Sequence, residues 1–397
     1  MDVKQKIKQL ARKYAPEFVG VRRHLHQNPE LSFKEYNTAA FIAEQLKNWG
    51  VAYEHGVADT GVVALIKGNN PDKKTIALRA DIDALPITEA NEVDYKSTNE
   101  GVMHACGHDA HTASLLGVVK ILHELKKDFE GTVKCIFQPG EEKAPGGASL
   151  MIEAGVLENP APISILGQHV HPPLEVGKVA FRPGLAMASA DEIYITVYGK
   201  GGHAAGPQFF VDPIYISSQI ITALQQVVSR RANPVIPSVL SFGKINSIGG
   251  ANNVIPNAVR IEGTFRTVDE KWRFEAHEKI RNIVNGLADS MDGRAEIEIL
   301  VGYPVLLNDE ELTNRQKQAA IDFLGEENVE DLPLRMGAED FAFYTHHLPA
   351  CFYRLGIRNE SQNITSGLHT NTFNIDEKAL ETGMGLMAYL AVQELAL

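Results

Sequence analysis

The spacing of apolar and polar residues predicts an alternation of helices and strands over the first 183 positions. Apolar residues recur at helical spacing in some windows, whereas others are short, continuous apolar runs bounded by glycine, proline or charge. The expected elements are helices over 36–49 and from Asp109 onward, and strands over 61–67, 75–81, 132–137 and from Ile163 to His169. Such alternation is typical of a largely parallel sheet covered by helices, that is, an α/β domain.

The pattern changes between Pro183 and Pro304, where two strands follow each other directly between two helices. The expected order is strand 191–198, helix 212–231, strands 238–245 and 259–267, helix 271–291 and strand 296–301. This β-α-β-β-α-β order predicts a ferredoxin-like α+β module inserted into the first domain. We therefore predict a catalytic domain of residues 1–184 and 304–397, interrupted by a satellite domain of residues 185–303.

Composition narrows the functional class. At 397 residues the chain is long for one compact core, which also favours two domains. A net charge of −12 argues against nucleic acid and anionic membrane as partners. The first 13 residues are charged and amphipathic rather than apolar, and the 3 cysteines are widely separated, so we expect a cytoplasmic protein without disulfides.

The segment Met103–Thr112 carries the densest group of metal-binding side chains, because one thiol and three imidazoles lie between His104 and His111. Thiolate and imidazole are the ligands that zinc and neighbouring transition metals prefer. Cys106 and His108 are two residues apart and cannot share a helix face. We expect them just before a helix capped by Asp109, with the helix dipole giving Cys106 added thiolate character.

Two further strands end in polar residues. The run 132–137 is followed by Pro-Gly and then Glu141-Glu142, and the strand from Ile163 delivers His169 and His171 as it ends. Adjacent carboxylates on an extended segment face opposite ways, so one can bind metal while the other acts as general base. Glutamate pairs are also common on solvated surfaces. The shared position at strand ends, where open α/β sheets build their sites, favours the functional interpretation.

With these motifs in order, the chain resembles the aminoacylase-like superfamily of dinuclear metal peptidases and amidohydrolases. Within it the chain is most similar to N-acyl-amino-acid amidohydrolases, hippurate hydrolases and auxin-conjugate hydrolases. The resemblance extends from the segment 23–31 (RHLHQNPEL) to 336–341 (MGAEDF). It implies Glu141 as the base that deprotonates a metal-bridging water, and five metal ligands: Cys106, His108, Glu142, His169 and His369.

The segment 80–86 (ADIDALP) departs from the superfamily pattern. Asp81 stands where many members have a histidine, so the resemblance leaves open whether it touches metal. Asp83 is then expected to orient a ligand. His171 competes with His169 for one ligand position, since both lie near the same strand end.

The inserted domain supplies three more candidates. His203, in the glycine-flanked segment 199–207, resembles the family histidine that polarises the scissile carbonyl, often in the neighbouring subunit; its alternative is a turn histidine without a role. Asn253, in Asn-Val-Ile-Pro, is expected to hydrogen-bond the substrate. Arg266 is expected to pair with a substrate carboxylate, although a strand-end arginine is often only a solvated charge.

The sequence thus predicts a metal-dependent amidohydrolase that cleaves the amide bond of N-acyl amino acids and holds two divalent ions. Zinc or manganese is expected, with cobalt or nickel as alternatives. A homodimer or higher oligomer through the satellite domain is implied by the resemblance. A dipeptidase or carboxypeptidase using the same centre, and a metal-binding scaffold without turnover, are the competing hypotheses.

Overall fold

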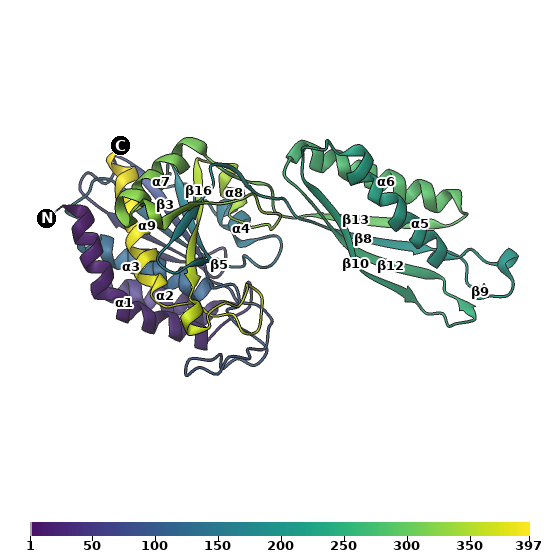
Figure 1. Ribbon diagram of the computed structural model, residues 1–397, viewed down its shortest axis with the longest axis horizontal. Coiled ribbons are helices and arrows are strands. Elements are labelled where there is room, and N and C mark those ends of the chain that lie inside the picture. The colour runs from purple at the N-terminus through teal and green to yellow at the C-terminus, as the bar shows by residue number, and fades with distance from the viewer. Residues whose placement is uncertain (1) are drawn as a thin grey trace. The chain divides into compact units, whose positions relative to one another are not determined.

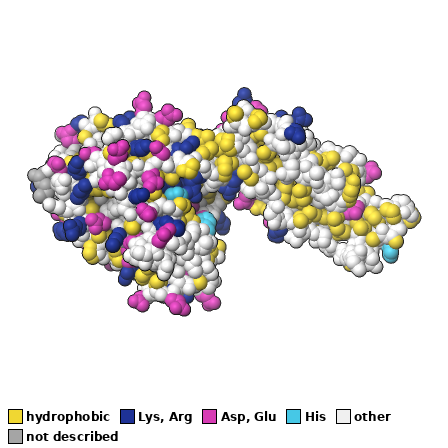
Figure 2. Space-filling view, viewed as in Figure 1, with side chains coloured by type: hydrophobic (Ala, Val, Ile, Leu, Met, Phe, Trp, Pro, Cys, Tyr) yellow, Lys and Arg dark blue, Asp and Glu magenta, His cyan; other side chains and the backbone are white. Residues whose placement is uncertain are grey.

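The computed structural model describes residues 2–397, which form two compact units (Figure 1). The first unit runs to Gly184 and resumes at Leu307–Pro333 and Asp340–Leu397. The second unit comprises Leu185–Leu306 and Leu334–Glu339. No helix among residues 2–397 has both the length and the apolar composition needed to cross a lipid bilayer. On the face shown in Figure 2, acidic and basic side chains are interspersed.

The first unit is built on an eight-stranded sheet with the order β1-β2-β4-β3-β5-β16-β6-β15. Neighbouring strands are parallel through its centre, from β4 through β3 and β5 to β16. The bounds are β1 (Ala52–Val57), β2 (Gly61–Lys67), β3 (Thr75–Asp81), β4 (Thr132–Gln138), β5 (Ile165–Glu175), β6 (Val179–Phe181), β15 (Val329–Asp331) and β16 (Ala350–Arg358). The prediction of a mixed α/β fold with a mostly parallel sheet is confirmed.

Helices cover this sheet and bury its apolar strands. Three of them, α1, α3 and α9, pack against one another, and the core beneath them is formed mainly of aliphatic side chains. The helices of this unit are α1 (Val3–Gln27), α2 (Tyr36–Trp49), α3 (His108–Glu124), α4 (Gly147–Glu153), α7 (Glu310–Leu324), α8 (Ala342–Thr345) and α9 (Ala379–Ala396). The first and last helices of the chain therefore belong to one core.

The predicted cap of α3 is wrong. The helix begins at His108, and its N-cap is Gly107, whose φ of 85° lies in the left-handed region that favours glycine. Asp109 lies inside the first turn, where its buried carboxylate accepts hydrogen bonds from Arg22 Nε at 2.7 Å and contacts His26 Nδ1 at 2.8 Å. Arg22, 87 residues away in the sequence, thus binds the side chain that the local pattern predicted to cap the helix.

The second unit has the predicted strand and helix order. Its sheet is antiparallel throughout, with the order β10-β12-β8-β13, and α5 and α6 pack together on it. The main elements are β8 (Asp191–Tyr198), α5 (Pro213–Gln226), β10 (Ser238–Ile248), β12 (Ala258–Thr267), α6 (Glu270–Ser290) and β13 (Arg294–Val301). Its short strands are β9 (Gly202–His203) and β11 (Val254–Ile255), and the chain passes from one unit to the other within β7 (Gly184–Met187) and β14 (Leu306–Asn308). A π-helical turn, Val227–Arg231, replaces the last part of the predicted helix.

A buried carboxylate ties this unit together. Asp191, at the start of β8, accepts hydrogen bonds from Arg273 Nε at 2.9 Å and from the Gly302 N–H at 3.1 Å, and its other neighbour is His277 Nε2 at 2.7 Å. Burial raises the pKa of Asp191, but the bonds from His277 and Arg273 outweigh it and lower the pKa overall. The charge therefore joins α6 to β8 and to the residue that follows β13.

We expect Asp191→Asn to lower the free energy of unfolding of the second unit by about 3 kcal/mol, because it removes the buried anion that Arg273 and His277 share and leaves Arg273 only the part-exposed Glu270. Urea unfolding of the full chain in a Trp49→Phe background would report it, since the remaining tryptophan, Trp272, lies in α6. The control is Glu262→Gln, which removes an exposed ion pair and should cost less than about 1 kcal/mol. Equal losses in the two variants would contradict this role of Asp191.

Candidate metal centre

Several of the predicted residues lie on or just after three neighbouring strands, β4, β3 and β5. Asp81 ends β3, Glu141 and Glu142 form the turn after β4, and His169 lies in β5 beside Arg354 of β16. One detail of the prediction is wrong, because β5 does not end at His169 and His171. It continues to Glu175 because β16 pairs with it along this length.

Potential ligand atoms gather in overlapping groups whose members lie within 4.8 Å of one another. Cys106, His108 and His169 form one group, and Cys106, Glu142 and His369 form another. Cys106 is common to both, so the two groups adjoin each other. A third group joins His108 to both glutamates, Glu141 and Glu142. The structure thus brings together all five predicted ligands and the predicted base.

In His108 and His169, one ring nitrogen is hydrogen-bonded to a neighbouring residue and the other faces the potential ligand atoms. His108 Nδ1 lies 2.9 Å from the carbonyl oxygen of Asp83 and 3.1 Å from its carboxylate, so it donates to that residue. Its Nε2 is buried without a hydrogen-bond partner. His169 Nδ1 donates to the Val170 carbonyl at 2.7 Å, and its Nε2 lies 3.5 Å from Cys106 Sγ. Metal-binding histidines are typically oriented in this way.

The electrostatics of the group favour a bound cation. Burial lowers the pKa of His108, but the carboxylates of Asp81 and Asp83 outweigh it and raise the pKa to about 10. Burial and the carboxylates of Glu142 and Glu141 raise the pKa of the Cys106 thiol. The added thiolate character expected from the helix dipole is thus opposed by burial and by these carboxylates. A divalent ion would supply the missing positive charge, and the donor set of thiolate, imidazole and carboxylate fits such an ion.

The structure also bears on the residues that the sequence left open. His169 belongs to a ligand group, whereas His171 belongs to none found among residues 2–397. Asp83 holds His108, as an orienting residue would. Asp81 is fully buried, and its two oxygens lie 2.5 Å from His111 Nδ1 and 2.7 Å from Arg79 Nη1.

Two buried groups near the centre were not assigned a role from sequence. His104 is buried with neither ring nitrogen hydrogen-bonded, and burial lowers its pKa to about 4, so the ring is neutral. Asp340 accepts from Arg79 Nη2 at 2.6 Å and Gln138 Nε2 at 2.8 Å, and its N–H donates to Glu141 at 3.4 Å. The sequence did hold a signal for Asp340. Arg79 lies inside an apolar strand, and a buried arginine requires an anionic partner.

The remaining candidates belong to the second unit. His203 is exposed in β9, opposite Val254 of β11, and its Nδ1 accepts the Ala205 N–H at 3.1 Å. Asn253 is exposed beside this pair, and its carbonyl oxygen accepts the Ala204 N–H at 3.1 Å. Arg266 is half-buried in β12 and donates to the Met336 carbonyl at 3.2 Å. Their roles with substrate stay predictions.

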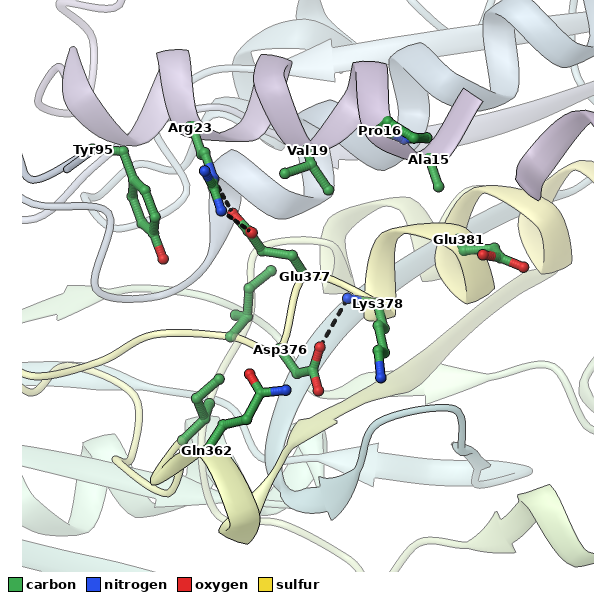
Figure 3. Close-up of a pocket in the computed structure, with 12 residues that line it drawn as sticks. Ala15, Pro16, Val19, Arg23, Tyr95, Gln362, Asp376, Glu377, Lys378 and Glu381 are labelled. Atoms are coloured by element: carbon green, nitrogen blue, oxygen red, sulfur yellow. Dashed lines mark hydrogen bonds and ion pairs between the residues drawn. The ribbon is translucent and has the colours of Figure 1, made fainter. Parts of the chain in front are cut away.

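A hollow of about 450 Å³ lies elsewhere in the first unit, between α1 and the segment before α9 (Figure 3). Arg23 and Glu377 form a two-pronged ion pair across it, with distances of 2.8 and 2.6 Å. None of the predicted site residues lines this hollow. Arg23, which begins the first resemblance motif, therefore joins the two ends of the chain in this structure.

Comparison with known proteins agrees with the geometry. The model of the peptidase family M20/M25/M40 matches residues 77–393. The chain belongs to this family. It is therefore a metal-dependent amidohydrolase, as its sequence predicted.

Individual relatives cover nearly the whole chain. It is 39% identical to thermostable carboxypeptidase 2 of Saccharolobus solfataricus, over 99% of each chain. It is 40% identical to N-acetyl-L-cysteine deacetylase of Bacillus subtilis, over 92% of this chain and 85% of that protein. The crystal structure of a dinuclear metal-binding peptidase of the M20 family from Bacillus subtilis superposes with a TM-score of 0.81 at 34% identity, over 97% of this chain and 99% of that one.

Removing divalent ions with a chelator should lower the thermal midpoint of unfolding, and adding manganese or zinc should restore it. At a concentration 100 times the dissociation constant, an ion bound only by the folded state contributes about 2.7 kcal/mol. His108→Ala should lose this response, whereas His123→Gln, on the same helix, should keep it. A wild-type midpoint that does not respond to either ion would contradict the assignment.

Proposed function

We propose that the chain hydrolyses the amide bond of N-acyl amino acids, releasing a carboxylic acid and a free amino acid. The observation that supports this most is the division of the glutamate pair. Glu142 Oε1 lies 3.1 Å from His369 Nε2, in the group that contains Cys106. Glu141 instead lies 4.0 Å from His108 Nε2 and accepts the N–H of Asp340. One carboxylate is thus available as a ligand and the other as a base.

The residues then have separate tasks. Cys106, His108, Glu142, His169 and His369 hold two divalent ions, which when bound polarise the amide carbonyl and lower the pKa of water. Glu141 accepts a proton from the attacking water and passes it to the leaving amine. The Asp340 N–H and the buried setting of Glu141 keep this carboxylate directed into the site.

The second unit completes the proposal. His203 donates a hydrogen bond to the carbonyl oxygen as negative charge develops, and it does so in the site of a partner subunit. Asn253 hydrogen-bonds the substrate, and Arg266 pairs with its carboxylate. An exposed histidine on a two-strand turn, as His203 is, can reach another subunit more readily than a buried one. We accordingly propose a homodimer that forms through this unit.

A peptidase function is the second candidate, because one relative at 39% identity is named a carboxypeptidase. The same metal centre would serve a peptidase. Only the substrate groups attached to the amide nitrogen and to the carbonyl carbon would differ. The scaffold hypothesis, in which metal is bound without turnover, gives Glu141 no task, because metal binding alone does not require that residue. We favour zinc or manganese as the native ion, with cobalt or nickel as alternatives.

The Glu141→Gln variant should keep its metal content and lose turnover by a factor on the order of 10² to 10⁴, the usual contribution of a general base. The assay is amine release from N-acetyl amino acids, hippurate and dipeptides by protein supplied with manganese or zinc. Retained activity in the variant would remove Glu141 from the proposal.

The control variant is Glu142→Gln, which should lose metal as well as activity because it removes a ligand. Wild-type preference for the N-acyl compounds would support the amidohydrolase, whereas preference for dipeptides would support the peptidase. No amine release from any substrate by metal-loaded protein would favour the scaffold.

Mixing two inactive variants tests the reach of His203. His203→Ala should lower turnover by a factor on the order of 10². In a mixed dimer of His203→Ala and Glu141→Gln subunits, one site receives an intact Glu141 and the partner's intact His203. Random mixing of a two-fold dimer should therefore restore activity in about a quarter of the sites. No recovery on mixing would show that His203 acts within its own subunit or has no role.

A further inference from the structure

The pairing of β3 with β5 stops near the end of β3 and early in β5, and the imidazole of His111 contacts both strands beyond that point. Their pairing extends over Ala77–Arg79 and Ile165–Gly167. Beyond it, His111 Nδ1 lies 2.5 Å from Asp81 Oδ1, and the Val170 N–H donates to His111 Nε2 at 2.9 Å. A side chain of α3 thus continues the connection between two strands after their own hydrogen bonds have stopped.

These two contacts determine which nitrogen carries the proton. A backbone N–H can only donate, so His111 Nε2 must be an acceptor without a proton. The ring proton is then on Nδ1, which donates to Asp81. The other oxygen of Asp81 accepts from Arg79 Nη1 at 2.7 Å. Both nitrogens of His111 are therefore used by protein groups.

The residue held by His111, Val170, is the one that anchors a predicted ligand. The Val170 N–H belongs to the peptide that joins it to His169, and the Val170 carbonyl oxygen accepts from His169 Nδ1 at 2.7 Å. The rings of His111 and His169 also touch, with centroids 4.6 Å apart and planes inclined by 62°. Moving His111 would change both the backbone and the packing surface that orient His169.

We propose that His111 is a positioning residue for the metal centre. Through Val170 it directs Nε2 of His169 toward Cys106, and so it sets the affinity for the ion that these two residues hold. Asp81 acts by keeping His111 in the required tautomer and is not itself a ligand. This inference rests on the proposed function, because it assumes that His169 binds metal.

Two substitutions separate the contacts of His111. In His111→Gln the side-chain oxygen lies near the position of Nε2 and can accept the Val170 N–H. In His111→Asn the side-chain nitrogen lies near the position of Nδ1 and can donate to Asp81, but the Val170 N–H loses its acceptor. The matched control is Thr112→Val, which removes a buried hydrogen bond of 3.0 Å from Thr112 Oγ1 to the Asp81 carbonyl. This bond joins the same helix to the same strand without touching β5.

The measurement is the dissociation constant of each ion for the four proteins, by competition of zinc with a chromophoric chelator, with the thermal midpoint of each chelated protein beside it. We expect His111→Asn to weaken one of the two ions on the order of 10- to 100-fold, as loss of an orienting group does. His111→Gln and Thr112→Val should bind both ions nearly as the wild type does, and the chelated midpoints should not account for the difference.

Three results would overturn the inference: equal affinities in all four proteins, equal weakening by Gln and Asn, or weakening by Thr112→Val as large as that by Asn. The last would show that the helix and strand are joined only for stability. A failure of the metal assignment is distinguishable from these results, because the wild type itself would then bind no zinc. A failure of the proposed hydrolysis would leave the four affinities as expected and would appear only as absent amine release.

Discussion

The confinement of several carboxylates within a buried pocket is the constraint on which the catalytic unit depends. Asp81, Asp83 and Glu141 are all shielded from water at one edge of the sheet. Charges in such a setting are unfavourable unless positive groups or hydrogen-bond donors face them. Arg79 neutralises part of this charge from inside β3, and the imidazoles of α3 contribute donors.

Two divalent ions would neutralise the remainder, so the arrangement that suits catalysis also suits folding with metal bound. The same principle holds in the second unit, where Arg273 and His277 surround the single carboxylate of Asp191. In that unit the protein itself supplies the positive charge, and the carboxylate is structural. The two sites differ in how much of their buried acidic charge faces a cation of the protein itself.

Local patterns predicted the fold where a strand is uniformly apolar. The strands 61–67, 75–81 and 191–198 have the expected bounds, because burial on both faces or strict alternation leaves a clear signal. The predicted ligands also gather as expected, since strand ends in a parallel sheet share an edge. The failures have a common cause. Asp109 pairs with Arg22, and β5 is lengthened by β16, and in both cases the partner is far away in the sequence.

The order of segments along the chain has a consequence for synthesis. The first unit is interrupted by the second, and it is completed only by β16, the loop carrying His369, and α9, which packs against α1. When Cys106, His108, Glu142 and His169 have left the ribosome, the nascent chain still lacks two parts of the site. These are β16, which lies beside His169, and His369, the last predicted ligand. Domains generally fold as units while the ribosome works from the N-terminus. The inserted module can therefore fold first, and the hydrolytic centre can be assembled only after β16 and the loop carrying His369 have left the ribosome.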